Sequence, residues 1–285
     1  GALRQLDDDA ARLRAGLDEQ HEAADDLRAQ TGAAFASAAE RVGVIVGDGS
    51  MLRGEIIAHW HDVVGTTNLM RGLDEKVASI RARARRWWGA EPKAEKLQEA
   101  VSDQLARVLV DEAESAVDAA ATAWTRTGWG RALLTDDLRQ LSPDFGARAA
   151  ATVRGWQQEV LGLVTEQGRG KRLRARLLAL GTNAIGATLM VVIFASTGGL
   201  TGAEAGVAGG TSLLAQRLLE SVFGAGAVER LTKESRALLD ARVRALLDEE
   251  GARFTGHVDA IAVERDLGER LAEAALRVRE ARNEL

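Results

Sequence analysis

The chain has 285 residues, of which 46% are hydrophobic and 28% are charged, with a formal net charge of -5. This hydrophobic content excludes wholesale disorder, and the negative charge excludes the global basic field expected of a nucleic-acid-binding protein. Cysteine is absent, which excludes disulfides, thiolate metal sites and a cysteine nucleophile. A cysteine-free chain fits a reducing compartment, and we therefore expect a cytoplasmic location.

The first part of the sequence predicts one long amphipathic helix. Apolar or small residues follow an alternating three-four spacing from Leu3 through Leu27 to Ala38, which places them on a single stripe of a helix. The run from Gly47 to Ser50 should end this helix. A helix of that length is typical of a bundle or a stalk, because a compact globule rarely needs one.

The rest of the chain also predicts helices, because Ala, Leu, Arg and Glu dominate and there are only 2 prolines. We expect roughly nine or ten helices in all. The later ones are predicted at Met51 to Val64, from a cap at Thr66 or Thr67 to Trp88, at Pro92 to Thr125, at Pro143 to Glu166 and at Glu264 to Glu284. A short helix should end near Leu141, and another helix after Gly226 should carry the apolar residues from Leu231 to Phe254.

The predicted fold is all-α: an elongated multi-helix bundle with long amphipathic helices and a central glycine-rich hydrophobic hairpin. Residues 1–167 form the first part of the bundle or stalk, and residues 168–226 form the apolar hairpin. Residues 227–285 form returning helices that pack on the first part.

The hairpin, Leu177 to Ala215, is the most unusual feature, because Glu204 is its only charged residue. Its first arm is long enough to span a bilayer core, although Thr, Asn and Ser interrupt it. In the second arm a glycine recurs every fourth residue, a spacing that lets helix backbones approach closely. The pattern fits either the buried core of a bundle or a segment that docks on a membrane. A permanent two-pass anchor is disfavoured, since the second arm is weakly hydrophobic.

Three sets of residues in and around this hairpin are candidates for function. A basic cluster directly before it suits anionic headgroups, or else forms a solvated helix start. The membrane-contact candidates are Arg169, Lys171, Arg172, Arg174, Arg176, Met190, Phe194 and Leu200. The close-packing glycines are Gly202, Gly206 and Gly210, and glycines that could act as hinges are Gly168, Gly170, Gly224 and Gly226.

No pattern in the sequence indicates an enzyme. A phosphate-binding loop needs glycines leading into Lys-Ser or Lys-Thr, and Gly168 to Lys171 is followed by Arg172 instead. His59 and His61 stand two residues apart, which points their rings to different faces of a helix. We therefore predict no catalytic, cofactor-binding or metal-binding residues in this chain.

Two stretches carry a resemblance to a known family. They are GDGSMLRGEIIAHW from Gly47 to Trp60, and TGGLTGAEAGVAGGTSLLAQ from Thr197 to Gln216. Both resemble the helical region that follows the GTPase domain in actinobacterial dynamin-like GTPases, and the resemblance extends over nearly the whole chain. The glycine-rich packing of the hairpin departs from it, since a simple lipid-binding tip does not require that composition.

The resemblance implies a non-catalytic stalk or effector region that couples nucleotide-driven motion to membrane contact or self-assembly. GTP and Mg²⁺ would be bound by a GTPase domain upstream, outside this chain. The implied partners are that domain, membrane lipid at the inner face of the plasma membrane, and a second copy or a paralogue. The alternative from the residues alone is a structural scaffold or dimerisation module with the hairpin as its buried core.

Overall fold

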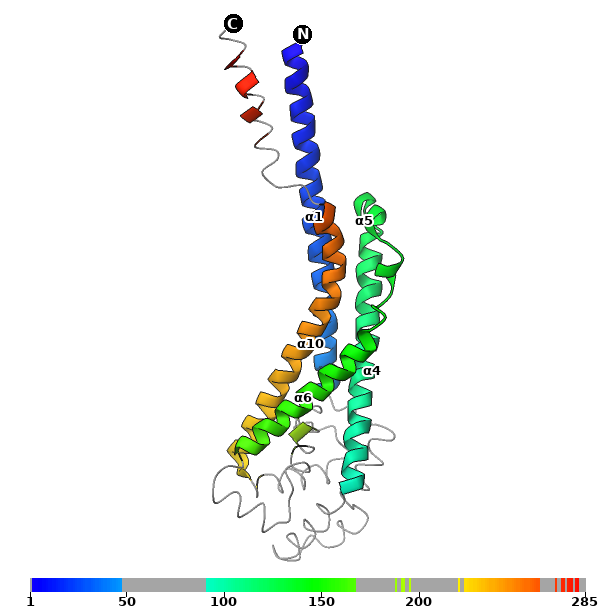
Figure 1. The fold of residues 1–285 in the computed structure, drawn as a ribbon, viewed down its shortest axis with the longest axis vertical. Coiled ribbons are helices and arrows are strands. Elements are labelled where there is room, and N and C mark those ends of the chain that lie inside the picture. The colour runs from blue at the N-terminus through cyan, green and yellow to red at the C-terminus, as the bar shows by residue number, and fades with distance from the viewer. Residues whose placement is uncertain are drawn as a thin grey trace, which may run out of the picture. The chain divides into compact units, whose positions relative to one another are not determined.

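The computed structural model describes residues 2–47, 91–167, 188, 191, 192, 195, 220, 223–261, 270, 273, 274, 276–278, 280 and 281. Every regular element in this part of the chain is a helix, and the predicted all-α, multi-helix bundle is confirmed (Figure 1). The elements are α1 (Ala2–Gly47), α4 (Glu91–Trp124), α5 (Gly128–Leu133), the 3-10 helix η2 (Asp137–Arg139), α6 (Phe145–Gln167) and α10 (Ala225–Ile261).

Helix boundaries follow the sequence signals closely where they can be compared. The first helix ends at Gly47, as the glycine break predicts. Pro92 lies in the first turn of α4, where its missing N–H leaves no hydrogen bond unmade. Helix α10 starts at Ala225 and contains the apolar residues from Leu231 to Phe254 that the sequence placed on one helix. The predicted helices from Met51 to Trp88 lie outside the described residues.

The chain divides into two compact units, each assembled from segments far apart in the sequence. Unit 1 comprises Gly1–Ser37, Glu114–Ser142 and Asp248–Leu285, and unit 2 comprises Ala38–Ala113 and Pro143–Leu247. The division falls within α1, α4 and α10, so each of these helices contributes residues to both units. The sequence-based division into residues 1–167, 168–226 and 227–285 follows the order of the chain and not the contacts between segments. It stays a prediction.

Unit 1 is built around an aromatic cluster from three helices. Trp124 of α4 and Phe254 of α10 are fully buried, with ring centroids 5.3 Å apart and an edge-to-face orientation. Phe35 of α1 meets Phe254 at 6.1 Å in the same manner. The indole Nε1 of Trp124 donates to Thr31 Oγ1 at 3.0 Å, and Thr31 donates to the Leu27 carbonyl. The cluster therefore buries large apolar area without leaving the indole N–H unpaired.

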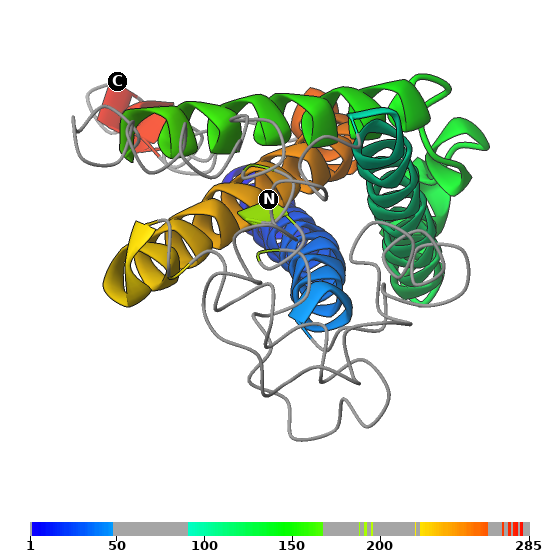
Figure 2. The same cartoon turned by 90° about the horizontal axis from the view of Figure 1, so that it is seen from below.

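Unit 2 is held by α6, which lies across α4 and α10 (Figures 1 and 2). Trp156 of α6 is fully buried, and its Nε1 donates to the Ser235 carbonyl of α10 at 2.7 Å. One turn further on, Arg242 of α10 donates to both carboxylate oxygens of Glu159. On the other side of α6, Gln157 reaches Ser102 of α4 at 2.6 Å. These contacts fix α6 against both neighbours.

Close packing at Gly251 gives a test of the unit 1 cluster. A Cβ at this position would lie 3.1 Å from Cδ2 of the buried Phe35 ring, whereas one at Gly256 would meet nothing within 4 Å. We expect Gly251→Leu to lower the free energy of unfolding by about 2–3 kcal/mol through overpacking. The matched control Gly256→Leu, on an exposed stretch of the same helix, should be neutral or mildly stabilising. Urea denaturation measures both, and equal effects would refute the packing argument.

Candidate functional site

Most residues that the sequence singled out lie outside the described part of the chain. This holds for the close-packing glycines and for all eight membrane-contact candidates, and their roles stay predictions. The same applies to Gly168 and Gly170. Of the four glycines expected as hinges, the structure describes Gly224 and Gly226.

Gly224 marks a break directly before α10. Its φ of 87° lies in the left-handed region that favours glycine. Its N–H donates to the Glu220 carbonyl at 2.8 Å, and its own carbonyl accepts from Val228 at 3.1 Å. Gly224 thus closes the preceding helical turn and opens α10. Gly226 lies inside the first turn of α10, so of these two glycines Gly224 is the one at the break. Whether either glycine flexes stays a prediction.

Four residues of the apolar segment are described, and all four are buried in unit 2. Val191, Val192 and Ala195 have no exposed surface, and Thr188 is 5% exposed. All four are helical. This part of the predicted hairpin therefore packs against protein, which agrees with the first of the two interpretations that the sequence left open.

Arg236 of α10 joins this apolar segment to the rest of unit 2. Its Nη1 donates to the Ala195 carbonyl at 3.3 Å, and its Nη2 donates to the Gly43 carbonyl near the end of α1. Its Nε donates to Asp240 one turn along α10 at 3.0 Å. The guanidinium side chain is 22% exposed. One side chain thus binds three parts of the chain through the fixed fork of its donors.

A half-open cavity of about 580 Å³ lies beside the same segment, with Thr188 in its wall. A polar ladder connects α4 and α6 there: Gln98 donates to Gln157, Gln157 donates to Ser102, and Ser102 donates back to the Gln98 carbonyl. Because these groups satisfy one another, the ladder is typical of helix pairing.

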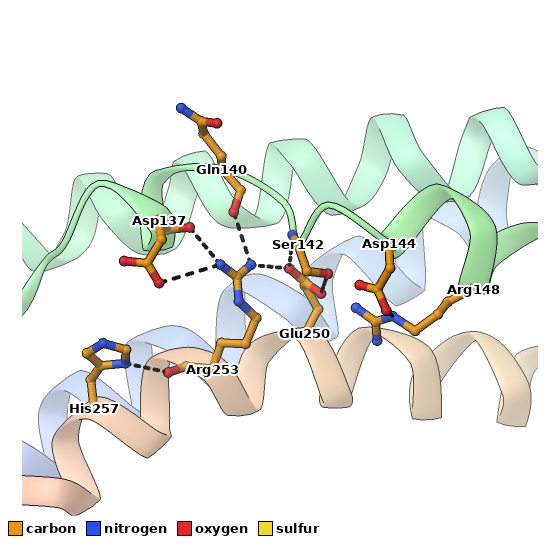
Figure 3. Close-up of polar contacts among 8 residues, drawn as sticks. All are labelled: Asp137, Gln140, Ser142, Asp144, Arg148, Glu250, Arg253 and His257. Atoms are coloured by element: carbon orange, nitrogen blue, oxygen red, sulfur yellow. Dashed lines mark hydrogen bonds and ion pairs between the residues drawn. The ribbon is translucent and has the colours of Figure 1, made fainter.

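Unit 1 contains a buried charge of its own, at Glu250 of α10 (Figure 3). Its carboxylate accepts from the backbone N–H of Ser142 at 2.8 Å, from the Ser142 hydroxyl at 2.6 Å, and from Arg253. Arg253 also donates to the carbonyls of Asp137 and Gln140. The network ties the connection between η2 and α6 to α10, and it leaves the buried carboxylate fully paired.

Ion pairs between helices shift pKa values in the expected directions. The hydrogen bond from Arg242 lowers the pKa of Glu159 against a smaller opposing effect of burial. The same pair raises the pKa of Arg242. In unit 1, the hydrogen bond to Asp259 raises the pKa of Arg28. We read both pairs as structural, because their side chains are partly open to solvent and each joins two helices.

Arg236 and Glu250 were not predicted from the sequence, although one signal was available for Glu250. Buried positions along α10 recur every three or four residues, through Leu231, Ser235, Leu239, Val243, Leu246, Glu250 and Phe254. Glu250 therefore replaces an apolar residue on the stripe, and a carboxylate there requires partners. Arg236 lies beside the stripe, and two of its three partners are backbone carbonyls, which no sequence pattern identifies.

Comparison with known proteins identifies no relative of this chain. No family model, curated protein or solved structure matches the chain. Among the described helices, none is long and apolar enough to cross a membrane. Within that same part of the chain, no group of three or more histidine or acidic side chains is placed to hold a metal ion.

Replacing the Arg236 side chain should loosen the apolar segment. We expect Arg236→Met to lower the free energy of unfolding by about 1–3 kcal/mol, because the Ala195 carbonyl loses a charged donor. Limited proteolysis should then cut near Ala195 earlier than in the unmodified protein. Arg244→Met, at an exposed position of the same helix, is the control and should change neither. Unaltered cleavage in Arg236→Met would show that this contact does not hold the segment.

Proposed function

We propose that this chain is a non-catalytic helical stalk region that keeps a membrane-contacting apolar segment packed against its own helices at rest. In this proposal it belongs to a dynamin-like GTPase, as the two resembling stretches suggest, and couples nucleotide-driven motion of an upstream domain to membrane contact or self-assembly. The observation that carries the proposal is the burial of Thr188, Val191, Val192 and Ala195 together with the Arg236 contact.

The position of Arg236 supports this coupling. From its own helix α10, the guanidinium contacts the end of α1 and the apolar segment simultaneously. A displacement of α1 relative to α10 would therefore pull on the bond to Gly43 and shift the same guanidinium that donates to Ala195. In this proposal, a displacement of the long helices breaks the hydrogen bonds of Arg236 and thereby releases the apolar segment.

The lengths of the helices agree with this role. Helices α1, α4 and α10 have 46, 34 and 37 residues and each contributes to both units. A continuous helix transmits a displacement between the residues at its two ends more directly than a chain with loops does. The basic cluster immediately before the apolar segment would bind anionic headgroups in the resting protein, before the segment is released.

The same burial also favours a second candidate, a structural scaffold in which the segment is permanent core. Thr188 lines the cavity in which the polar ladder pairs α4 with α6. In this candidate the segment never leaves the bundle, and the basic cluster is a solvated helix start. The two candidates differ in whether the protein binds lipid.

Vesicle co-sedimentation at low salt separates the two. We expect the purified chain to sediment with vesicles containing phosphatidylserine and to remain in solution with pure phosphatidylcholine, because each basic residue near an anionic surface contributes about 1 kcal/mol. A variant with five basic residues replaced by glutamine should lose most of this binding. The five are Arg169, Lys171, Arg172, Arg174 and Arg176.

A matched control carries the same change in charge at exposed positions elsewhere. It replaces Arg14, Arg126, Arg230, Lys233 and Arg244 by glutamine. This variant should bind vesicles nearly as well as the unmodified protein. Equal loss in both variants would indicate nonspecific attraction and argue against the cluster. Absence of binding by the unmodified protein would support the scaffold instead.

A further inference from the structure

The apolar stripe of α1 changes its surroundings along the helix. From Ala24 to Ala38 its residues are buried, whereas Leu13 near the other end is 59% exposed. Ala10 and Leu17, on the same stripe, are partly exposed. In the last segment of the chain, Leu276 and Val278 are 52% and 51% exposed. All of these residues except Ala38 belong to unit 1, so one compact unit carries two uncovered apolar helix surfaces.

The contacts between α1 and α10 define an antiparallel register. Phe35 meets both Gly251 and Phe254, and Arg28 donates to Asp259 at 3.1 Å. For each facing pair, the residue number in α1 and the residue number in α10 therefore sum to between 286 and 289. Residues nearer the start of α1 therefore face residues nearer the end of α10, and α10 ends at Ile261.

Continued past Ile261, this register brings the two uncovered surfaces together. Leu13 falls opposite residues 273–276, and Ala10 falls opposite residues 276–279. These ranges contain Leu276 and Val278, and the described residues from 270 to 281 are helical.

The charges of the two segments also favour pairing between the start of α1 and the segment 270–281. Residues 1–26 contain eight Asp or Glu and three Arg, so a second copy of this helix surface would be repelled. The acidic run from Asp7 to Asp9 falls opposite residues 277–282, which hold three arginines and one glutamate. Arg14 falls opposite Glu273. Opposite charges at facing positions favour this antiparallel pairing.

We propose that the stripe of α1 from Ala10 to Leu17 is an interaction surface for the chain's own segment 270–281. The segment docks on it as an antiparallel helix and covers Leu13 and Val278. This inference does not rest on the proposed function, because its observations lie in unit 1 and involve neither lipid nor the apolar segment.

The absence of native cysteine makes disulfide trapping a clean test. We expect Ala10→Cys with Val278→Cys, the stripe pair, to form an intrachain disulfide under mild oxidation at least about tenfold faster than Ala15→Cys with Val278→Cys, because a disulfide needs Cα atoms within about 7 Å. Ala15 lies on the exposed side of α1, away from the stripe. Both pairs are read on non-reducing gels, and circular dichroism verifies folding.

A charge exchange provides a second, independent readout. Asp9→Lys should slow disulfide formation in the stripe pair, and adding Arg277→Glu should restore it, since the facing charges then attract again. Disulfides that join two chains and depend on protein concentration would overturn the proposal in favour of a second copy. Equal rates in the stripe pair and the control pair would also overturn it.

Discussion

One partly buried arginine connects the apolar segment to α1 and α10 in unit 2. The guanidinium of Arg236 presents its N–H donors in a rigid fork, and these donors require acceptors because the side chain is partly withdrawn from water. It finds them in the carbonyls of Gly43 and Ala195 and in Asp240. Because these acceptors belong to three segments, the side chain sets α1, α10 and the apolar segment in one arrangement. The proposed storage of this segment depends on that arrangement.

The positions and ends of individual helices could be predicted from the sequence, but the contacts between helices could not. Three-four spacing located α1, and Gly47 and Pro92 marked helix ends that the structure confirms. The two-unit division depends instead on contacts between distant residues. Trp124 meets Thr31 and Ser142 meets Glu250 only because the helices are already placed. No local pattern contains that information.

The candidate site shows the same limit. The sequence identified the apolar segment from its lack of charge, which is a local property. It left open whether the segment is buried, because apolar helices suit both a core and a membrane. The burial of Val191, Val192 and Ala195 answers this for the resting protein at these residues. Arg236 contacts α1 and the apolar segment through backbone carbonyls. Because every residue has a backbone carbonyl, these partners cannot be recognised from the sequence.

Hydrogen exchange of the segment from Thr188 to Ala195 tests the central claim most directly. If the segment is packed against its own helices at rest, its amides should exchange in solution about as slowly as those of α6, whose Trp156 and Val160 are equally buried. They should become faster when Arg236 is replaced by methionine. Exchange in the unmodified protein at the rate of an unprotected peptide would contradict the account.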